Sequence, residues 1–160
     1  MIEAEDRVAD LFCGLGNFTL PIATLAREVV GVEGSSILTE RAQKNAVING
    51  LGNKTIFYRR NLFECTAVNF AQMGKFDRIL IDPPRDGAMA VCQALVQLGL
   101  QNSELKPKRI VYVSCSPSTL ARDAEILVQE GNYVLSRAGI VNMFPHKSHV
   151  ESIAVFDLHN

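Results

Sequence analysis

The sequence predicts an α/β fold with a seven-stranded, mostly parallel sheet, an antiparallel last strand and helices on both faces. Short apolar runs alternate with longer amphipathic stretches, as in strands joined by crossover helices. Apolar residues make up 48% of the 160 residues, which is enough for a sizeable core. The last two strands are separated by a loop containing Pro145, without a helical pattern, so they are expected to pair antiparallel. We therefore expect one domain over residues 1–160.

The expected strands are short apolar runs. In chain order they are residues 7–12, 28–33, 55–58, 76–82, 109–114, 133–140 and 149–157. The expected helices begin near Phe18 and then cover residues 35–49, 88–100 and 119–129.

Local signals explain where these helices begin and end. Asn17 is a candidate N-cap of the first helix, and Pro21 falls in its first turn, where its missing N–H has no helical partner to lose. Ser35 or Ser36 caps the second helix, and Gly50 and Gly52 stop it. Gly131 stands where the last helix would take a left-handed C-terminal cap.

Composition excludes several classes of protein. No apolar stretch approaches the roughly 20 residues that span a bilayer, and Met1 is followed by acids rather than by a secretory leader, so we expect a cytoplasmic protein. Lys and Arg total 16 against 17 Asp and Glu, which is not the basic excess of a domain that grips nucleic acid alone. The thiols are expected to be reduced, because neither zinc spacing nor a disulfide framework is present among Cys13, Cys65, Cys92 and Cys115.

The first strand ends in a glycine-containing loop, residues 10–17 (DLFCGLGN). Gly14 and Gly16 let the backbone turn sharply and approach a ligand. Thr19 stands where a dinucleotide fingerprint has its third glycine, which disfavours a pyrophosphate site. Glu33 ends the second strand, where a carboxylate can accept both hydroxyls of a nucleoside ribose; the alternative is a solvated loop acid.

Asp82 follows another apolar strand and precedes two prolines and an arginine. Open α/β sheets bind ligands at the carboxyl ends of their strands, and a rigid turn there can hold a flat base beside a cofactor. Arg85 would engage a phosphate or steady Asp82. The alternative is an ordinary turn with an Arg–Asp pair.

Cys115 is the candidate nucleophile. It follows an apolar strand and precedes a helix expected to begin near Ser118, whose positive end would stabilise a thiolate. The alternative is a small buried hydrophobic residue. Glu151, at the start of the last strand, is a candidate general base. His146, His149 and Glu151 lack a further ligand cluster, so we predict no metal and assign the histidines to loop packing or substrate contact.

These motifs, in this order, resemble the catalytic domain of the RNA (uracil-5)-methyltransferases over nearly the whole chain. The residues that carry the resemblance are the loop 10–17, Val32 to Gly34, Asp82 to Arg85, residues 113–117 (VSCSP), residues 119–123 (TLARD), residues 143–146 (MFPH) and residues 149–151 (HVE). The resemblance implies a Rossmann-like class I fold and a methyl transfer from S-adenosylmethionine to a uridine of RNA. The segments 119–123 and 143–146 look more like members that act on large-subunit ribosomal RNA than like those that act on transfer RNA.

The resemblance also implies residue roles. Cys115 would be the nucleophile that adds to carbon 6 of uracil, and Glu151 the base that removes the carbon 5 proton. Pro83, Arg85 and Ser116 would contact the substrate, although the family commonly has Asn at the position of Ser116. The S-adenosylmethionine site would be formed by Phe12, Gly14, Gly16, Asn17, Glu33, Asn61 and Asp82.

Three alternatives remain open. Acid-Pro-Pro motifs also occur in enzymes that methylate a nitrogen of a nucleic acid, a reaction that needs no cysteine. The family's upstream RNA-binding barrel is not expected in this chain, so the chain could be a cofactor-binding fragment that does not turn over. A nicotinamide-dependent reductase is disfavoured by Thr19.

Overall fold

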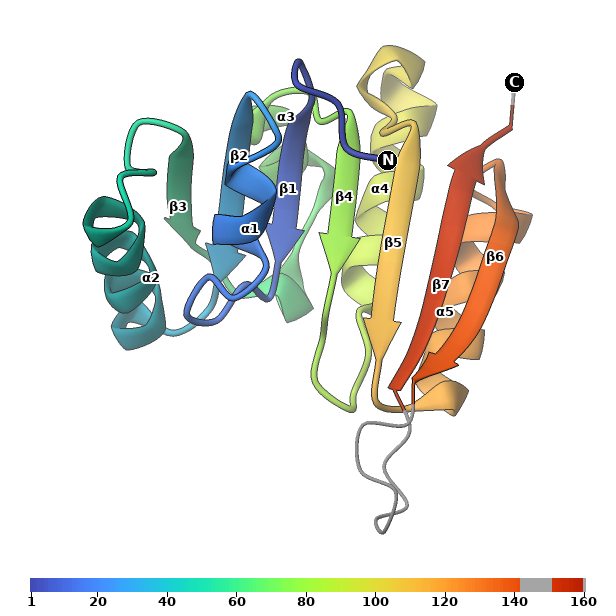
Figure 1. The fold of residues 1–160 in the computed structure, drawn as a ribbon. Coiled ribbons are helices and arrows are strands. Elements are labelled where there is room, and N and C mark those ends of the chain that lie inside the picture. Colours follow the sequence, from blue (N-terminus) through green and yellow to red (C-terminus); the bar gives the residue numbers. More distant parts are fainter. Residues whose placement is uncertain (142–150, 160) are drawn as a thin grey trace, which may run out of the picture.

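The computed structural model describes residues 1–141 and 151–159 (Figure 1). Their strands form one seven-stranded sheet in the order β3-β2-β1-β4-β5-β7-β6, which confirms the predicted α/β architecture. The strands are β1 (Arg7–Leu11), β2 (Glu28–Glu33), β3 (Thr55–Arg59), β4 (Arg78–Ile81), β5 (Arg109–Ser114), β6 (Tyr133–Val141) and β7 (Glu151–Leu158). The first two residues expected in the last strand lie outside the described residues.

Strand direction follows the prediction. β1 pairs in parallel with β2 and β4, β2 with β3, and β4 with β5. β7 pairs antiparallel with both β5 and β6, so it is the strand that runs against the others. The carboxyl ends of β1, β2, β4 and β5 therefore meet the beginning of β7 at one edge of the sheet, the lower edge in Figure 1.

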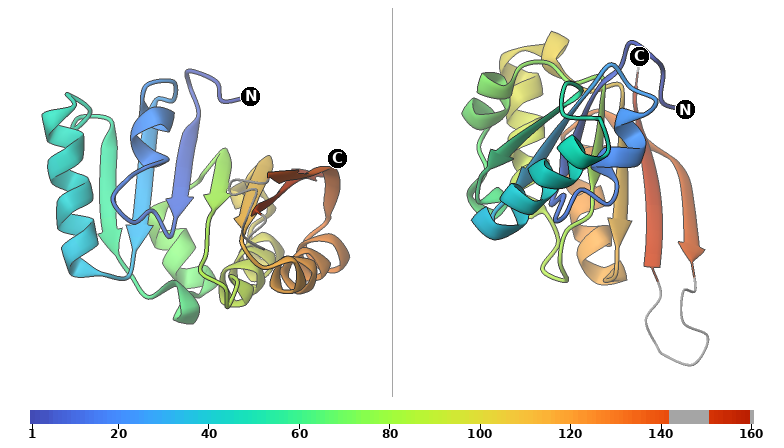
Figure 2. Two further views of the ribbon diagram at one scale, coloured as in Figure 1. Left: turned by 60° about the horizontal axis from the view of Figure 1, so that its bottom comes forward. Right: turned by 60° about the vertical axis from the view of Figure 1, so that its left-hand side comes forward.

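Five α-helices cover the two faces of the sheet (Figure 2), as predicted. α1 and α2 lie against one face, over β1 to β3, and α3, α4 and α5 lie against the other. The helices are α1 (Thr19–Ala23), α2 (Ser36–Ile48), α3 (Ala67–Met73), α4 (Met89–Gln101) and α5 (Pro117–Gln129), with short 3-10 turns η1 (Leu62–Glu64) and η2 (Ser103–Leu105).

The core is divided unequally between the two faces. The large cluster fills the space between the sheet and α3 to α5, with Phe70, Tyr112 and Phe156 among its fully buried side chains. A smaller cluster of Val8, Ala23, Ala26 and Val29 lies under α1. In the described part of the chain, no helix has both the length and the apolar character needed to cross a membrane.

Two of the predicted helix caps are wrong. Asn17 does not cap α1: the capping position is Phe18, which makes no side-chain cap bond, and Asn17 lies exposed before it. After α5, the residue with a positive φ is Asn132 (φ 61) and not Gly131. Asparagine tolerates this conformation, whereas Gly131 is required for space, because a Cβ there would lie 2.6 Å from the Leu127 carbonyl oxygen.

The predicted cap and stop of α2 are confirmed, whereas the start of α5 and the presence of α3 differ from the prediction. The Ser35 side chain accepts a hydrogen bond from the Leu38 N–H, and Gly50 (φ 70) ends α2 as expected. α5 begins at Pro117, two residues before the predicted start. The sequence reading missed α3, whose start is fixed by a capping box in which Thr66 and Asn69 bond each other's backbone N–H.

Candidate active site

Five predicted site residues come together at the shared strand edge. Phe12 follows β1, Glu33 ends β2, Asp82 follows β4, Cys115 follows β5, and Glu151 begins β7. This is the edge at which open α/β sheets bind ligands. The antiparallel direction of β7 brings Glu151 to it, because a parallel last strand would begin at the opposite edge.

A cavity of about 280 Å³ opens between the ends of β1, β2 and β4. Four of the predicted cofactor residues line it. Its lining is Phe12, Glu33, Gly34, Asn61, Leu62, Phe63, Asp82 and Pro84. The mixture of two carboxylates, an amide and two phenyl rings is suited to a molecule with a flat ring and hydroxyl groups.

The loop backbone fixes the carboxylate of Glu33. One oxygen accepts a hydrogen bond from the Gly14 N–H (3.1 Å) and the other from the Ser35 N–H (2.9 Å). A carboxylate oxygen has two acceptor sites, so each still has capacity for a ligand hydroxyl. Gly14 has a φ of 54 and makes its contact through the backbone, which agrees with the role expected of a glycine at this position.

The aromatic wall of this cavity is formed by Phe12 and Phe63. Their ring centroids are 5.6 Å apart, with an interplanar angle of 59°. Phe12 has a φ of 64, unusual for a side chain of this size, and this conformation ends β1. Asn61 accepts a hydrogen bond from the Phe63 N–H (3.1 Å) and so holds that residue at the cavity. The two rings offer a surface on which a nucleobase can stack.

A second cavity, of about 430 Å³, lies against the ends of β4, β5 and β7. Asp82 lines both cavities and is therefore the residue between them. The lining of the second cavity is Asn17, Phe18, Asp82, Val113, Val141, Glu151 and Ile153. Partial burial and the neighbouring carboxylate of Glu151 raise the pKa of Asp82.

The strand register relates Cys115 to Glu151. β5 and β7 pair Val113 with Ile153 and Ser114 with Ser152. One residue further, this register places Cys115 opposite Glu151. Because strand side chains alternate, Glu151 belongs to the same face of β7 as Ile153, which lines the second cavity together with Val113. Glu151 lines this cavity itself, and Cys115 is half-buried directly after the end of β5.

The other three cysteines have a different environment. They are buried, whereas Cys115 is half-exposed, and all four are free. Burial raises the pKa of the Cys13 thiol to about 12 and that of Cys65 to about 11, and it also raises the pKa of Cys92. A raised pKa keeps a thiol protonated and unreactive. Burial therefore disfavours reaction at these three thiols, and Cys115 is the most accessible of the four.

Asp10 is a buried acid behind the glycine loop. Thr19 donates a hydrogen bond to its Oδ2 (2.5 Å), while its Oδ1 is buried without a hydrogen-bond partner among the described residues. Burial and, to a smaller extent, the charge of Asp82 raise the pKa of Asp10 to about 7. A dinucleotide-binding loop would have glycine at the position of Thr19. The hydrogen bond gives a reason for threonine here, because it connects the beginning of α1 to β1.

The remaining predicted residues are more scattered. Asn17 lines the cavity of Glu151 and not that of Glu33, and Gly16 turns the loop with a φ of 87. Pro83 is buried, while its neighbour Pro84 lines the first cavity. Arg85 is exposed on the following turn. The Ser116 hydroxyl lies 3.3 Å from that of Ser118.

Sequence reasoning missed several lining residues. Phe63 and Phe18 are large apolar side chains with exposed fractions of 49% and 43%. Each comes shortly after a strand end in a polar stretch, and this position was the available signal. Val113 and Ile153 were assigned to strands, but the cavity they line depends on the pairing of β5 with β7.

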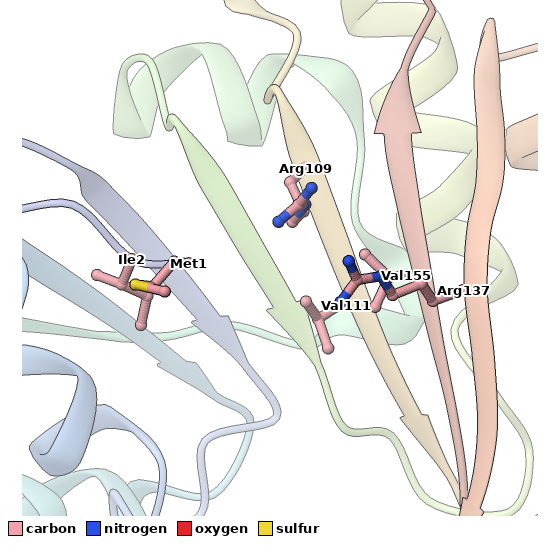
Figure 3. Close-up of a pocket in the computed structure, with 6 residues that line it drawn as sticks. All are labelled: Met1, Ile2, Arg109, Val111, Arg137 and Val155. Carbon is pink, nitrogen blue, oxygen red and sulfur yellow. The ribbon is translucent and has the colours of Figure 1, made fainter.

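A further cavity, of about 180 Å³, lies on the face of β5 to β7 that is opposite α5 (Figure 3). It is lined by Met1, Ile2, Arg109, Val111, Arg137 and Val155. Arg109 belongs to the amino end of β5, away from the shared strand edge. Within residues 1–141 and 151–159, no group of three or more His, Cys, Asp or Glu side chains could hold a metal ion, and His146 and His149 lie outside those residues.

Comparisons with known proteins agree on one family. The family model described as tRNA (uracil-5-)-methyltransferase matches residues 2–158. The 23S rRNA (uracil(1939)-C(5))-methyltransferase RlmD of Cupriavidus pinatubonensis is 64% identical over 156 residues, which cover 98% of this chain and 34% of that protein. This chain thus spans about a third of the length of such curated relatives.

Solved structures share the fold of this chain. The tRNA (uracil-54, C5)-methyltransferase of Pyrococcus abyssi, solved in complex with S-adenosyl-L-homocysteine, matches with a TM-score of 0.76 and 30% identity. The match covers 97% of this chain and 35% of that one. The magnesium protoporphyrin IX methyltransferase of Synechocystis, solved with bound SAM, has a TM-score of 0.68 and 18% identity over 96% of this chain and 70% of its own, and shows the shared fold alone.

Proposed function

Because this chain belongs to the tRNA (uracil-5-)-methyltransferase family, we propose that it is the catalytic domain, over residues 1–160, of an enzyme that methylates carbon 5 of a uridine in RNA. The methyl donor is S-adenosylmethionine, and the RNA is 23S ribosomal RNA, on which the named curated relatives act. The observation that carries the proposal is the pairing of Ser114 with Ser152, which brings the residues next to them, Cys115 and Glu151, to the same end of two paired strands. Glu151 lines a cavity that shares Asp82 with a nucleoside-sized cavity.

The first cavity fits the cofactor. Glu33 presents a carboxylate, oriented by two backbone N–H groups, to the ribose hydroxyls, and Phe12 and Phe63 offer rings to the adenine. Asn61 and Asp82 also line this cavity, while Gly14 and Gly16 shape the loop beside it. When bound, S-adenosylmethionine supplies an electrophilic methyl group on a positively charged sulfur. Asp82 lines both cavities, so it would be one of the residues between the bound cofactor and the substrate.

The second cavity fits the uracil, and its chemistry requires a nucleophile and a base. Carbon 5 of uracil is too weakly nucleophilic to accept a methyl group directly. The Cys115 thiolate adds to carbon 6, and the electrons of the carbon 5–carbon 6 double bond move to the carbonyl at carbon 4, which makes carbon 5 nucleophilic. After carbon 5 has gained the methyl group, Glu151 accepts the carbon 5 proton, the double bond re-forms and the thiolate leaves.

The protein environment favours this use of Cys115. Cys115 is not fully buried, unlike the other three cysteines, and the 13-residue helix α5 begins two residues after it, at Pro117. The base must leave its stack to enter the cavity, so the target uridine is flipped or unpaired. Pro83, Arg85 and Ser116 are the proposed substrate contacts, with Arg85 placed on an exposed turn where it can meet a phosphate.

The charge balance of the chain indicates that it does not hold the RNA alone. The chain contains 16 basic and 17 acidic residues, so other parts of the enzyme would supply most of the phosphate contacts. Ribosomal RNA as substrate would place the enzyme in the cytoplasm.

The test is mass spectrometry of the full-length protein mixed with S-adenosylmethionine and 5-fluorouridine-substituted 23S ribosomal RNA. Fluorine at carbon 5 cannot leave as a proton, so the enzyme remains bound to the RNA. We expect an adduct that maps to Cys115 and is absent in Cys115→Ser. Methylation of a nitrogen without any adduct would favour the alternative nitrogen-methylating reaction, and full activity of Cys115→Ser would refute the covalent mechanism.

A further inference from the structure

We propose that Asp123 is a positioning residue for methyl transfer: with Tyr112, Thr119 and Arg122 it clasps the loop that carries Asp82 to the helix that follows Cys115. This inference rests on the proposed function. We give the name clasp to two sets of hydrogen bonds: those from Tyr112 and Arg122 to the Asp123 carboxylate, and those of Asp123, Thr119 and Arg122 to the backbone of residues 85–88.

Asp123 is the centre of the clasp. Its side chain is completely buried, and its Oδ2 accepts hydrogen bonds from the Tyr112 hydroxyl (2.6 Å) and from the Ala88 N–H (2.6 Å). Its Oδ1 accepts from Arg122 Nε (2.9 Å). A buried carboxylate is expensive unless it is paired and hydrogen-bonded, and these contacts satisfy it. Asp123 therefore joins β5, α5 and the beginning of α4 at one point.

Two further residues of α5 hold the same loop. Arg122 Nη2 donates to the Asp86 carbonyl (2.9 Å), and the Thr119 hydroxyl lies within bonding distance of the Arg85 carbonyl (3.1 Å). That hydroxyl is also 3.2 Å from the Ser116 carbonyl, in the segment just after Cys115. The clasp thus reaches toward the nucleophile as well as toward the loop.

Gly87 shows how closely the loop and helix approach. A Cβ at this position would lie 2.7 Å from both Asp123 Oδ2 and Arg122 Nη2, and the residue has a φ of +78. The loop therefore contacts the helix at a residue without a side chain, and this close contact restricts the position of the loop backbone. Every residue from 85 to 88 is fixed, either by a hydrogen bond or by this contact.

The position of the clasp suggests its purpose. The loop 82–88 leaves β4 and carries Asp82, which lines both cavities, while the Cys115 segment leaves the neighbouring strand β5. Methyl transfer requires the cofactor and the uracil to be aligned within a fraction of an ångström, and misplacement by about 1 Å can cost about a hundredfold in rate. Asp123 lines neither cavity, so it acts through the loop and not on the substrate.

A pair of tyrosine variants separates positioning from stability. Tyr112→Phe removes one hydroxyl from the clasp. Tyr133→Phe is the matched control, because Tyr133 is also buried and donates one hydrogen bond, to the Pro107 carbonyl (2.9 Å), at the opposite edge of the sheet. We expect both variants of the full-length protein to lose similar thermal stability and to bind S-adenosylhomocysteine as the unaltered protein does. Only Tyr112→Phe should lose about tenfold in single-turnover methylation of 23S ribosomal RNA at saturating cofactor and RNA.

Asp123→Asn gives a second readout. It keeps the shape of the side chain but removes the charge that pairs with Arg122, so we expect a larger loss of turnover than in Tyr112→Phe, again with cofactor affinity retained. Equal turnover of Tyr112→Phe and Tyr133→Phe, or unchanged turnover of Asp123→Asn, would overturn the proposal. If the unaltered protein methylates no uridine, the proposed function fails first, and this inference fails with it.

Discussion

At the scale of single residues, Asp10 is a buried acid whose environment strongly alters its chemistry. Its pKa is raised from 3.8 to about 7, mainly by burial, so the folded protein binds a proton there more tightly than the unfolded chain does. Stability therefore falls as the pH rises from about 4 to about 7, where the unfolded state has released the proton and the folded state still holds it.

Asp10→Asn should remove this dependence. Between pH 5 and pH 8, the free energy of unfolding of the unaltered protein should fall by roughly 2–3 kcal/mol more than that of the variant. Urea unfolding of both proteins at several pH values measures the difference. Because other titrating groups, including Asp82, are present in both proteins, parallel pH profiles would show that Asp10 is not the source.

Glu151 has a role that can be separated from that of Cys115. Glu151→Gln keeps the shape of the side chain but cannot accept the carbon 5 proton, whereas Cys115 can still add to the ring. The full-length variant should therefore accumulate methylated 23S ribosomal RNA covalently attached to Cys115, even when the RNA contains no 5-fluorouridine. Denaturing gel electrophoresis with labelled RNA would reveal a slow-migrating band. Normal turnover without that band would assign proton removal to another group.

At the scale of elements, two glycines that end helices do so for different reasons. Gly50 has a φ of +70 and open space around its Cα, so a side chain there meets only backbone strain. Gly131 has no such φ, but a Cβ would collide with the Leu127 carbonyl. We expect Gly50→Ala to cost about 1 kcal/mol of stability and Gly50→Asn less, because asparagine tolerates a positive φ.

Gly131 should respond differently. Both Gly131→Ala and Gly131→Asn should cost more than Gly50→Ala, roughly 1–3 kcal/mol, because the backbone must move whichever side chain is added. Chemical unfolding of the four variants measures these differences. If Gly131→Asn were clearly more stable than Gly131→Ala, backbone conformation and not lack of space would be the reason for glycine at this position.

Helices and strands were predictable from the sequence where the residues that define them lie close together in the chain. The Ser35 cap and the Gly50 stop of α2 are of this kind, and so are the apolar strands. α3 was missed because its seven residues include few of the apolar repeats that reveal a helix, and its capping pair, Thr66 and Asn69, uses Asn where Glu or Gln is the usual signal. The αL residue after α5 was misassigned because glycine and asparagine stand side by side, and packing decides between them.

At the scale of the whole molecule, cofactor binding should stabilise the fold. A ligand that binds only the folded state at 100 times its Kd adds about 2.7 kcal/mol, which for a domain of this size corresponds to roughly 5–10 °C in Tm. We expect S-adenosylhomocysteine to produce this shift in thermal unfolding.

Two variants of β2 make this measurement specific. Glu33→Gln should lose most of the shift, because the amide replaces one of the two acceptor oxygens held for the ribose. Glu28 lies at the other end of the same strand, where it pairs with Arg7. Glu28→Gln should therefore lower the Tm but keep the shift that the ligand produces. Equal shifts in both variants would remove Glu33 from the proposed cofactor site.

The assembly of the site was only partly predictable for a related reason. Order along the chain placed Glu33, Asp82 and Cys115 at strand ends, and parallel strands share one edge. Which site residues share a cavity depends on the order of the strands in the sheet. Asn17 lines the same cavity as Glu151, and Asp82 lines both cavities. Apolar walls such as Val113 and Ile153 become visible only when the pairing of distant strands is known.

The pairing of β5 with β7 also limits which length changes this protein can tolerate. If one residue were inserted or deleted between Glu151 and Ala154, Glu151 would turn to the helix-covered face while the rest of β7 kept its partners. A change of two residues would keep its facing but displace it by about 7 Å along β5. Length variants near Glu151 therefore divide into odd changes, which reverse the direction of its side chain, and even changes, which keep that direction but move it away from Cys115.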